Sequence, residues 1–263
     1  MHGLLAGPAA AQPSPIYPEE LTVVSPPIVA PAQATIAVLG DSLADGIWGG
    51  LYRKLVRDKR YTVYRGAKNS TGFGGDDFLE SIERAFAAGP VDAVVMMIGA
   101  NDRRGIYVGG VLAAPYRSPQ WPETYAGRVG RFMDAVQARG VPLVWILLPI
   151  MREADASRDA RQINSIVAAA ASSRSQVVLV PTWAMTQGPD GEYAAYLKDA
   201  KGQQKLFRHT DGVHFADFGY DMISEAVFAR LGDVSLPLWL MTTAAPPPKT
   251  PAKPAAKAKV PQQ

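Results

Sequence analysis

The sequence predicts an α/β fold in which a mostly parallel β-sheet is covered by helices on both faces. Between residues 34 and 231, short apolar runs alternate with longer stretches in which apolar residues recur at helical spacing. This alternation is typical of βαβ units, in which a helix returns the chain so that the next strand runs parallel. A chain of 263 residues has room for one such domain of about 200 residues with tails.

The expected elements follow one another without an internal repeat. Pro122 suits the first turn of its helix, and Gly140 suits the end of that helix. Each expected strand is a short apolar run, and these runs lie at 35–39, 61–65, 91–98, 141–148 and 176–180. Helices are expected near 46–58, 76–88, 122–139, 157–173 and 217–231.

Both ends of the chain differ in composition from its centre. Residues 1–33 start with a short apolar, alanine-rich piece and continue as a Pro/Ala-rich arm. The start is similar to the end of a secretory signal, although it lacks a basic n-region, and the alternative is a disordered leader. Residues 245–263 form a Pro/Ala/Lys tail that we expect to be disordered, either lying along an anionic cell-envelope polymer or acting as a spacer. We therefore predict a periplasmic protein with one globular domain at residues 34–244.

Charge and cysteine content argue against several classes of function. The net charge is +3, but four lysines lie in the tail, and the central body alone carries +1. A nucleic-acid partner is therefore not expected. The absence of cysteine excludes disulfides, thiolate metal sites and a cysteine nucleophile. The longest uncharged apolar stretch, at 141–151, is too short and too interrupted by proline to form a stable membrane span.

The first strand ends in Gly40-Asp41-Ser42-Leu43, which places a serine hydroxyl at its carboxyl end. In an open parallel sheet the ligand crevice lies outside the carboxyl ends of the strands, so Ser42 is a candidate nucleophile. The alternative is that Ser42 only caps the following helix.

The candidate base for this serine is a histidine just before the last helix. Of the three histidines, His2 lies in the leader and His209 has no acidic neighbour of comparable spacing, so we assign His209 to the loop. His214 follows Asp211 by three residues, with Gly212 between them. A carboxylate at this spacing can orient one ring nitrogen and leave the other free to face a serine.

Candidate oxyanion donors follow two other strands. Asn101 comes after the strand at 91–98 and presents a side-chain amide, although it is equally suited to a turn. The glycine-rich segment 69–75 follows the second strand and can offer a backbone N–H. Its spacing fits neither a dinucleotide fingerprint nor a Walker loop, and Asp76 and Asp77 add negative charge, which argues against a nucleotide-binding flavodoxin-like domain.

Two connections, at 103–121 and 181–210, are longer than a compact α/β domain needs. Their aromatic and arginine side chains either recognise substrate or pack the loops against the domain. We expect substrate contacts from Asp41, Arg103, Tyr107 and Arg208.

Taken together, Gly40-Asp41-Ser42-Leu43, Gly72, Gly99-x-Asn101-Asp102 and Asp211-x-x-His214 resemble the four sequence blocks of the SGNH or GDSL hydrolase superfamily. The resemblance covers about residues 34–231, and other segments look like a poorly characterised exported bacterial subfamily. The sequence has no Gly-x-Ser-x-Gly elbow, which argues against the α/β-hydrolase fold.

The resemblance implies a three-layer αβα sandwich whose five-stranded parallel sheet has the flavodoxin-like order 2-1-3-4-5. It implies that Ser42 is the nucleophile, His214 the general base and then acid, and Asp211 the orienting carboxylate. It also implies an oxyanion hole made of the Ser42 and Gly72 backbone N–H groups and the Asn101 side chain, with Gly74 and Gly75 as neighbouring alternatives to Gly72. No metal or organic cofactor is implied.

The leading functional hypothesis is a serine esterase that removes a small acyl group, such as acetyl, from a carbohydrate or cell-wall polymer. Two alternatives remain open. In the first, the acyl group is transferred to a saccharide hydroxyl. In the second, the domain binds an envelope saccharide and catalyses no reaction.

Overall fold

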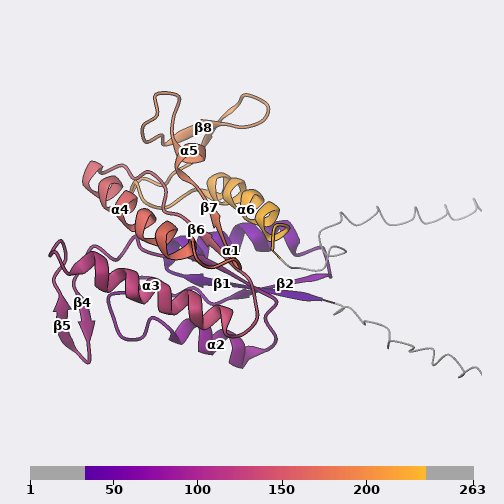
Figure 1. Cartoon of the computed structure of the whole chain (residues 1–263). Coiled ribbons are helices and arrows are strands. Elements are labelled where there is room, and N and C mark those ends of the chain that lie inside the picture. Colours follow the sequence, from indigo (N-terminus) through magenta and orange to yellow (C-terminus); the bar gives the residue numbers. More distant parts are fainter. Residues whose placement is uncertain (1–32, 235–263) are drawn as a thin grey trace, which may run out of the picture. The chain divides into compact units, whose positions relative to one another are not determined.

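The computed structural model describes residues 33–234, which fold around one five-stranded sheet (Figure 1). Neighbouring strands pair in parallel in the order β2-β1-β3-β6-β7. Because the intervening labels belong to separate hairpins, this is the order 2-1-3-4-5 among the strands of the sheet, as predicted. The strands are β1 (Ala34–Gly40), β2 (Tyr61–Arg65), β3 (Ala93–Met97), β6 (Leu143–Ile146) and β7 (Val177–Val180).

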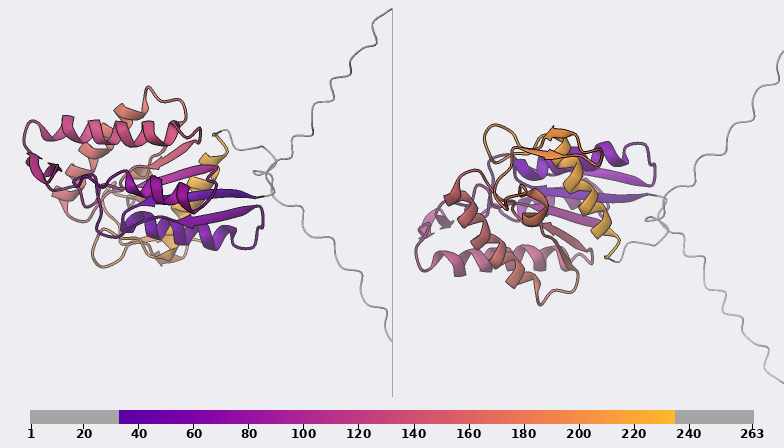
Figure 2. Two further views of the ribbon diagram at one scale, coloured as in Figure 1. Left: turned by 90° about the horizontal axis from the view of Figure 1, so that it is seen from below. Right: turned by 90° about the horizontal axis from the view of Figure 1, so that it is seen from above.

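Helices cover both faces of this sheet, so the predicted three-layer α/β class is confirmed (Figures 1 and 2). On one face α1 (Ser42–Leu55) packs along α6 (Asp217–Leu231). On the other face lie α2 (Glu80–Ala88) and α3 (Trp121–Gln137), and α3 packs against α4 (Ala154–Ala171). Since both faces are covered, the central strands read as continuous apolar runs, and every residue of β3 and β6 is buried.

The starts of α1 and α2 depart most from the expected positions, for local reasons. Helix α1 begins at Ser42 rather than near 46, because the Asp41 carboxylate accepts the backbone N–H of Leu43 at 2.9 Å and caps the helix there. Helix α2 begins only at Glu80, after a turn in which the Glu80 N–H donates to the Asp77 carbonyl at 3.0 Å.

The two long connections contain hairpins that the sequence did not predict, β4 (Ile106–Val108) with β5 (Val111–Ala114) and β8 (Tyr196–Lys198) with β9 (Gln204–Leu206). The second connection also contains the single turn α5 (Trp183–Thr186). Most hairpin residues are exposed, so they lack the buried alternation by which strands are recognised.

The predicted leader, the arm before Gln33 and the tail at 245–263 lie outside the described residues, as do residues 235–244 of the predicted domain. The predictions of export and of a tail that contacts an anionic polymer therefore stay predictions. Within 33–234, no helix combines the length and the hydropathy that a membrane crossing requires.

The contact between α1 and α6 depends on a glycine. A Cβ on Gly46 would lie 1.9 Å from the Tyr220 ring of α6, whereas a Cβ on Gly49 of the same helix would lie 3.4 Å from the flexible end of Arg53. We expect Gly46→Ala to lower the free energy of unfolding by about 1–3 kcal/mol through overpacking. Gly49→Ala should instead leave stability unchanged or raise it by up to about 1 kcal/mol. Urea unfolding of both variants tests this, and a Gly46→Ala protein as stable as Gly49→Ala would contradict the packing described.

Candidate active site

Ser42 is the first residue of α1 and is separated from the carboxyl end of β1 by Asp41 alone. The helix cap is supplied by Asp41, which overturns the alternative that Ser42 serves only as the cap. The serine hydroxyl is therefore available for another partner, and the helix N-terminus beside it favours developing negative charge.

That partner is His214, whose Nε2 lies 2.7 Å from the Ser42 Oγ. The other ring nitrogen, Nδ1, lies 2.7 Å from Asp211 Oδ2. The second carboxylate oxygen of Asp211 accepts the backbone N–H groups of Val213 and His214 at 2.8 and 2.9 Å. Burial raises the pKa of Asp211, but these N–H groups and the imidazole outweigh it and hold the pKa at about 2. An ionised Asp211 keeps the proton on Nδ1, so Nε2 accepts the serine hydroxyl.

The loop that carries His214 is held by the guanidinium of Arg208, which is only 1% exposed. It donates to the carbonyls of Ile150 and Val213 at 2.7 Å each and of Gly212 at 3.3 Å. Burial lowers the pKa of Arg208 to about 10, so it remains charged at neutral pH. The sequence suggested that Arg208 contacts substrate, but its donors are given to these carbonyls. It therefore acts by positioning the histidine loop.

The candidate oxyanion donors lie on the loops that follow β2 and β3. The Asn101 Nδ2 donates one N–H to the Thr71 carbonyl at 3.0 Å, which ties the two loops together and leaves its second N–H. A Cβ on Gly72 would lie 1.9 Å from Asp102 Oδ1, so only glycine fits there. Within the part of the chain that the structure describes, no acceptor is bonded to the Gly72 N–H. By contrast, the Gly74 N–H is one of the groups that lower the pKa of Asp102. These contacts favour Gly72 over Gly74.

Two carboxyl groups are buried beside these loops. Asp41 is 0% exposed and Asp102 is 1% exposed, with the Tyr125 hydroxyl donating to Asp102 Oδ2 at 2.8 Å. Burial raises the pKa of Asp41 to about 7 against the opposing Leu43 N–H. Burial likewise raises the pKa of Asp102 to about 6 against the Tyr125 hydroxyl. Because Asp41 is buried, it shapes the serine turn rather than offering a surface to substrate.

The other two expected substrate contacts lie on the loop between β3 and α3. Arg103 lies at a pocket, where its Nε donates to Asp159 Oδ2 at 2.7 Å. Tyr107 is 44% exposed on the hairpin strand β4, and its contact with substrate stays a prediction. Asp159 and Tyr125 were not predicted to belong to the site. Each lies on a helix, and only its contact with a residue far away in the sequence reveals a role. No cluster of three or more His, Cys, Asp or Glu side chains suited to a metal occurs within 33–234.

The sheet order, together with a serine, histidine and aspartate at the carboxyl edge of the strands, defines the SGNH class of fold. Solved structures with TM-scores of 0.52 include a GDSL-like lipase from Bacteroides thetaiotaomicron, 14% identical, with 76% of this chain and 88% of that chain covered. The psychrotrophic esterase EstA from Pseudoalteromonas sp. has the same TM-score of 0.52 at 12% identity, with 76% of this chain and 98% of EstA covered. TesA is 18% identical at a TM-score of 0.52, with the same shares of 76% and 98%. At these identities the likeness establishes the fold alone.

Residues 35–230 match the family described as protein of unknown function DUF459, and the chain belongs to that family, which is part of the SGNH superfamily. The predicted resemblance is thereby confirmed. A comparison with curated proteins finds no match.

The raised pKa of Asp41 makes a contribution to stability that depends on pH. The native state keeps a proton on Asp41 up to about pH 7, whereas the unfolded chain releases it near 3.8. This contribution is therefore fully present below about pH 4 and is lost as pH rises through about 7. Asp41→Asn keeps a side chain that can cap α1 but does not titrate. We expect the free energy of unfolding of Asp41→Asn, relative to wild type, to rise between about pH 5 and about pH 8 in urea titrations. If the difference in free energy of unfolding between Asp41→Asn and wild type did not depend on pH, the raised pKa of Asp41 would be contradicted.

Proposed function

We propose that this protein is a serine esterase of the SGNH type that hydrolyses small acyl esters through an acyl-serine intermediate. The observation that carries the proposal is the continuous hydrogen-bonded row from Asp211 through His214 to Ser42. The donors at Gly72 and Asn101 lie on neighbouring loops at the same edge of the sheet. The esterase and lipase names of proteins with this fold support the same reaction class.

In the first half-reaction, His214 Nε2 takes the hydroxyl proton as Ser42 Oγ attacks the ester carbonyl carbon. The carbonyl oxygen becomes an oxyanion that accepts hydrogen bonds from the Ser42 and Gly72 N–H groups and the Asn101 amide. Asp211 stays ionised and stabilises the imidazolium. Collapse of the tetrahedral intermediate breaks the bond to the leaving alcohol, which takes its proton from His214 and leaves an acyl-serine.

In the second half-reaction, a water molecule gives a proton to His214 and attacks the acyl carbon through the same oxyanion intermediate. The bond to Ser42 Oγ then breaks, the serine recovers its proton from His214, and the carboxylic acid leaves. If a saccharide hydroxyl takes the place of water, the same residues transfer the acyl group.

We infer that the alcohol is a carbohydrate or cell-wall polymer. The side chains of His214 and Asp211 are 34% and 48% exposed, so the triad is open to an alcohol too large to be enclosed. The lysine-containing tail and the signal-like start support an envelope substrate, and both lie outside the described residues.

The triad predicts a specific loss of activity. We expect Ser42→Ala and His214→Ala to lower kcat/KM for p-nitrophenyl acetate by roughly 10⁴-fold or more, because nucleophile and base act as one unit. His209→Ala is the matched control, since this exposed histidine interacts with the His214 loop through its backbone alone, and it should keep wild-type activity.

Circular dichroism of each variant checks that the fold is intact. Undiminished turnover in Ser42→Ala would refute the nucleophile. Wild-type protein without turnover on any ester, but with acylated product from a saccharide acceptor, would establish the transferase alternative. Saccharide binding without turnover of any kind would establish the binding module.

The oxyanion hole makes a smaller and separate prediction. Asn101→Ala removes one donor to the oxyanion, which typically lowers kcat by about 10²–10³-fold. KM should change little, because the donor is needed mainly in the transition state. Steady-state kinetics on p-nitrophenyl acetate measure this split, and thermal unfolding reports the separate effect of losing the bond to Thr71. A change in KM alone would place Asn101 outside the oxyanion hole.

A further inference from the structure

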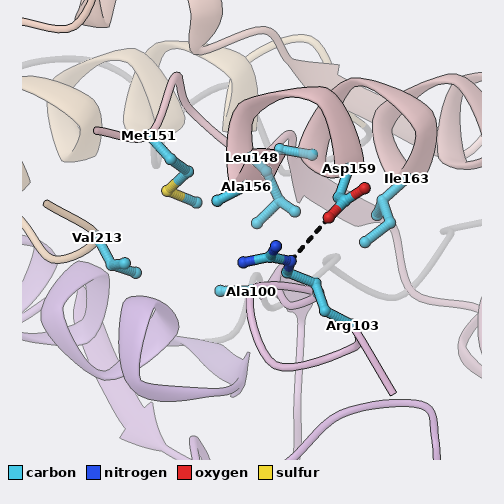
Figure 3. A pocket seen from close by; sticks show the side chains of 10 residues that line it. Ala100, Arg103, Leu148, Met151, Ala156, Asp159, Ile163 and Val213 are labelled. Atoms are coloured by element: carbon cyan, nitrogen blue, oxygen red, sulfur yellow. Dashed lines mark hydrogen bonds and ion pairs between the residues drawn. The ribbon is translucent and has the colours of Figure 1, made fainter. Parts of the chain in front are cut away.

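A pocket opens beside the catalytic loops, between the loop after β3, the loop after β6 and the first half of α4 (Figure 3). Its lining includes Ala100 and Val213, which directly precede Asn101 and His214 in the chain. An acyl carbon bonded to Ser42 Oγ, with its oxygen toward Asn101, would therefore have its substituent near this pocket. The remaining apolar wall comes from Leu148, Met151, Ala156, Ala160 and Ile163.

The pocket is small and its wall is fixed. Its volume of about 60 Å³ holds only a few water-sized groups. A saccharide does not fit, so the pocket suits the acyl side of the ester. Side chains of α4 hold the loop after β6, because Asn164 exchanges two hydrogen bonds of 2.8 Å with the Leu148 backbone. Ser157 likewise exchanges two of 2.8 Å with the Met151 backbone.

Two side chains of the pocket are charged, Arg103 and its partner Asp159, which a pocket for a plain alkyl group does not need. Arg103 projects among the apolar side chains, held by its Nε bond to Asp159 (Figure 3). The Asp159 side chain is only 8% exposed and is shared with Arg117 at 3.3 Å, so two guanidinium groups face one carboxylate there. Arg117 also lies 3.9 Å from the exposed Asp155. Because Asp159 is shared between two guanidinium groups, it neutralises the charge of Arg103 only in part.

We propose that this pocket binds a short acyl group that ends in a carboxylate, with Arg103 as the residue that recognises the anion. The preferred substrates are then half-esters of short dicarboxylic acids. The apolar walls contact the methylene groups of the acyl chain. The N–H groups of Arg103 that are not bonded to Asp159 donate to the terminal carboxylate. This inference rests on the proposed esterase function, because it assigns the acyl side of the same site.

The test compares two probes of nearly equal shape, monoethyl succinate and its neutral amide, ethyl succinamate. Binding to Ser42→Ala protein, measured by NMR titration, is independent of turnover. We expect the half-ester to bind about tenfold more tightly than the amide, as a charge-assisted pair at a partly desolvated site allows.

Adding Arg103→Met to the Ser42→Ala protein should bring the two dissociation constants within about twofold of each other, with the amide affinity unchanged. The control is Arg158→Met in the same background. Arg158 pairs with the exposed Asp155 on the same helix and is not part of the pocket, so the preference should persist.

Equal binding of the two probes, no measurable binding of the half-ester, or a preference that survives Arg103→Met would each overturn the inference. The esterase proposal fails separately, if wild-type protein does not hydrolyse esters or if Ser42→Ala is as active as wild type.

Discussion

The hydrogen bond between Ser42 and His214 joins residues 172 positions apart, and much of the fold is needed to make it. The serine is fixed where β1 passes into α1, and the histidine lies just before α6. These two helices pack along each other, and their close approach requires Gly46, which faces the Tyr220 ring. The helix pair thus brings the two halves of the site together. Arg208 completes the placement by binding the carbonyls of the histidine loop.

Loops at the edge of a sheet have no neighbouring strand to which their backbone groups can hydrogen-bond. In this protein, buried polar side chains hold these loops instead. Asp41 accepts the N–H of Leu43, Arg208 donates to four carbonyl groups, and the Tyr125 hydroxyl holds the Asp102 carboxylate in place. Burying such groups costs free energy that each hydrogen bond only partly offsets. Their contribution is therefore the fixed position of the loops more than net stability. The raised pKa of both aspartates is a measure of that cost.

The features predicted correctly are those that depend on residues close together in the sequence. Apolar runs marked the strands, and the polar residues that end them, Ser42 and Asn101, lie at the predicted edge of the sheet. Interactions between residues far apart in the chain were not predicted. Arg103 and Asp159 are 56 residues apart, and nothing near either one predicts their bond. Arg208 was expected to contact substrate, and only the carbonyl groups that converge on its guanidinium explain why it is buried instead. The hairpins were missed because exposed strands carry no buried alternation.

The proposed catalytic triad and most of the pocket wall rest on different parts of the fold, although Val213 of the histidine loop also lines the pocket. Ser42, His214 and Asp211 depend on β1, α1 and the loop before α6. The pocket instead depends on α4, through Ser157 and Asn164, and on the loop that carries Arg103. The side chains that α4 contributes to the pocket can therefore change without moving the triad. Under the proposed function, the triad accordingly speaks for the reaction class, whereas the α4 wall is the part of the fold that selects the acyl group.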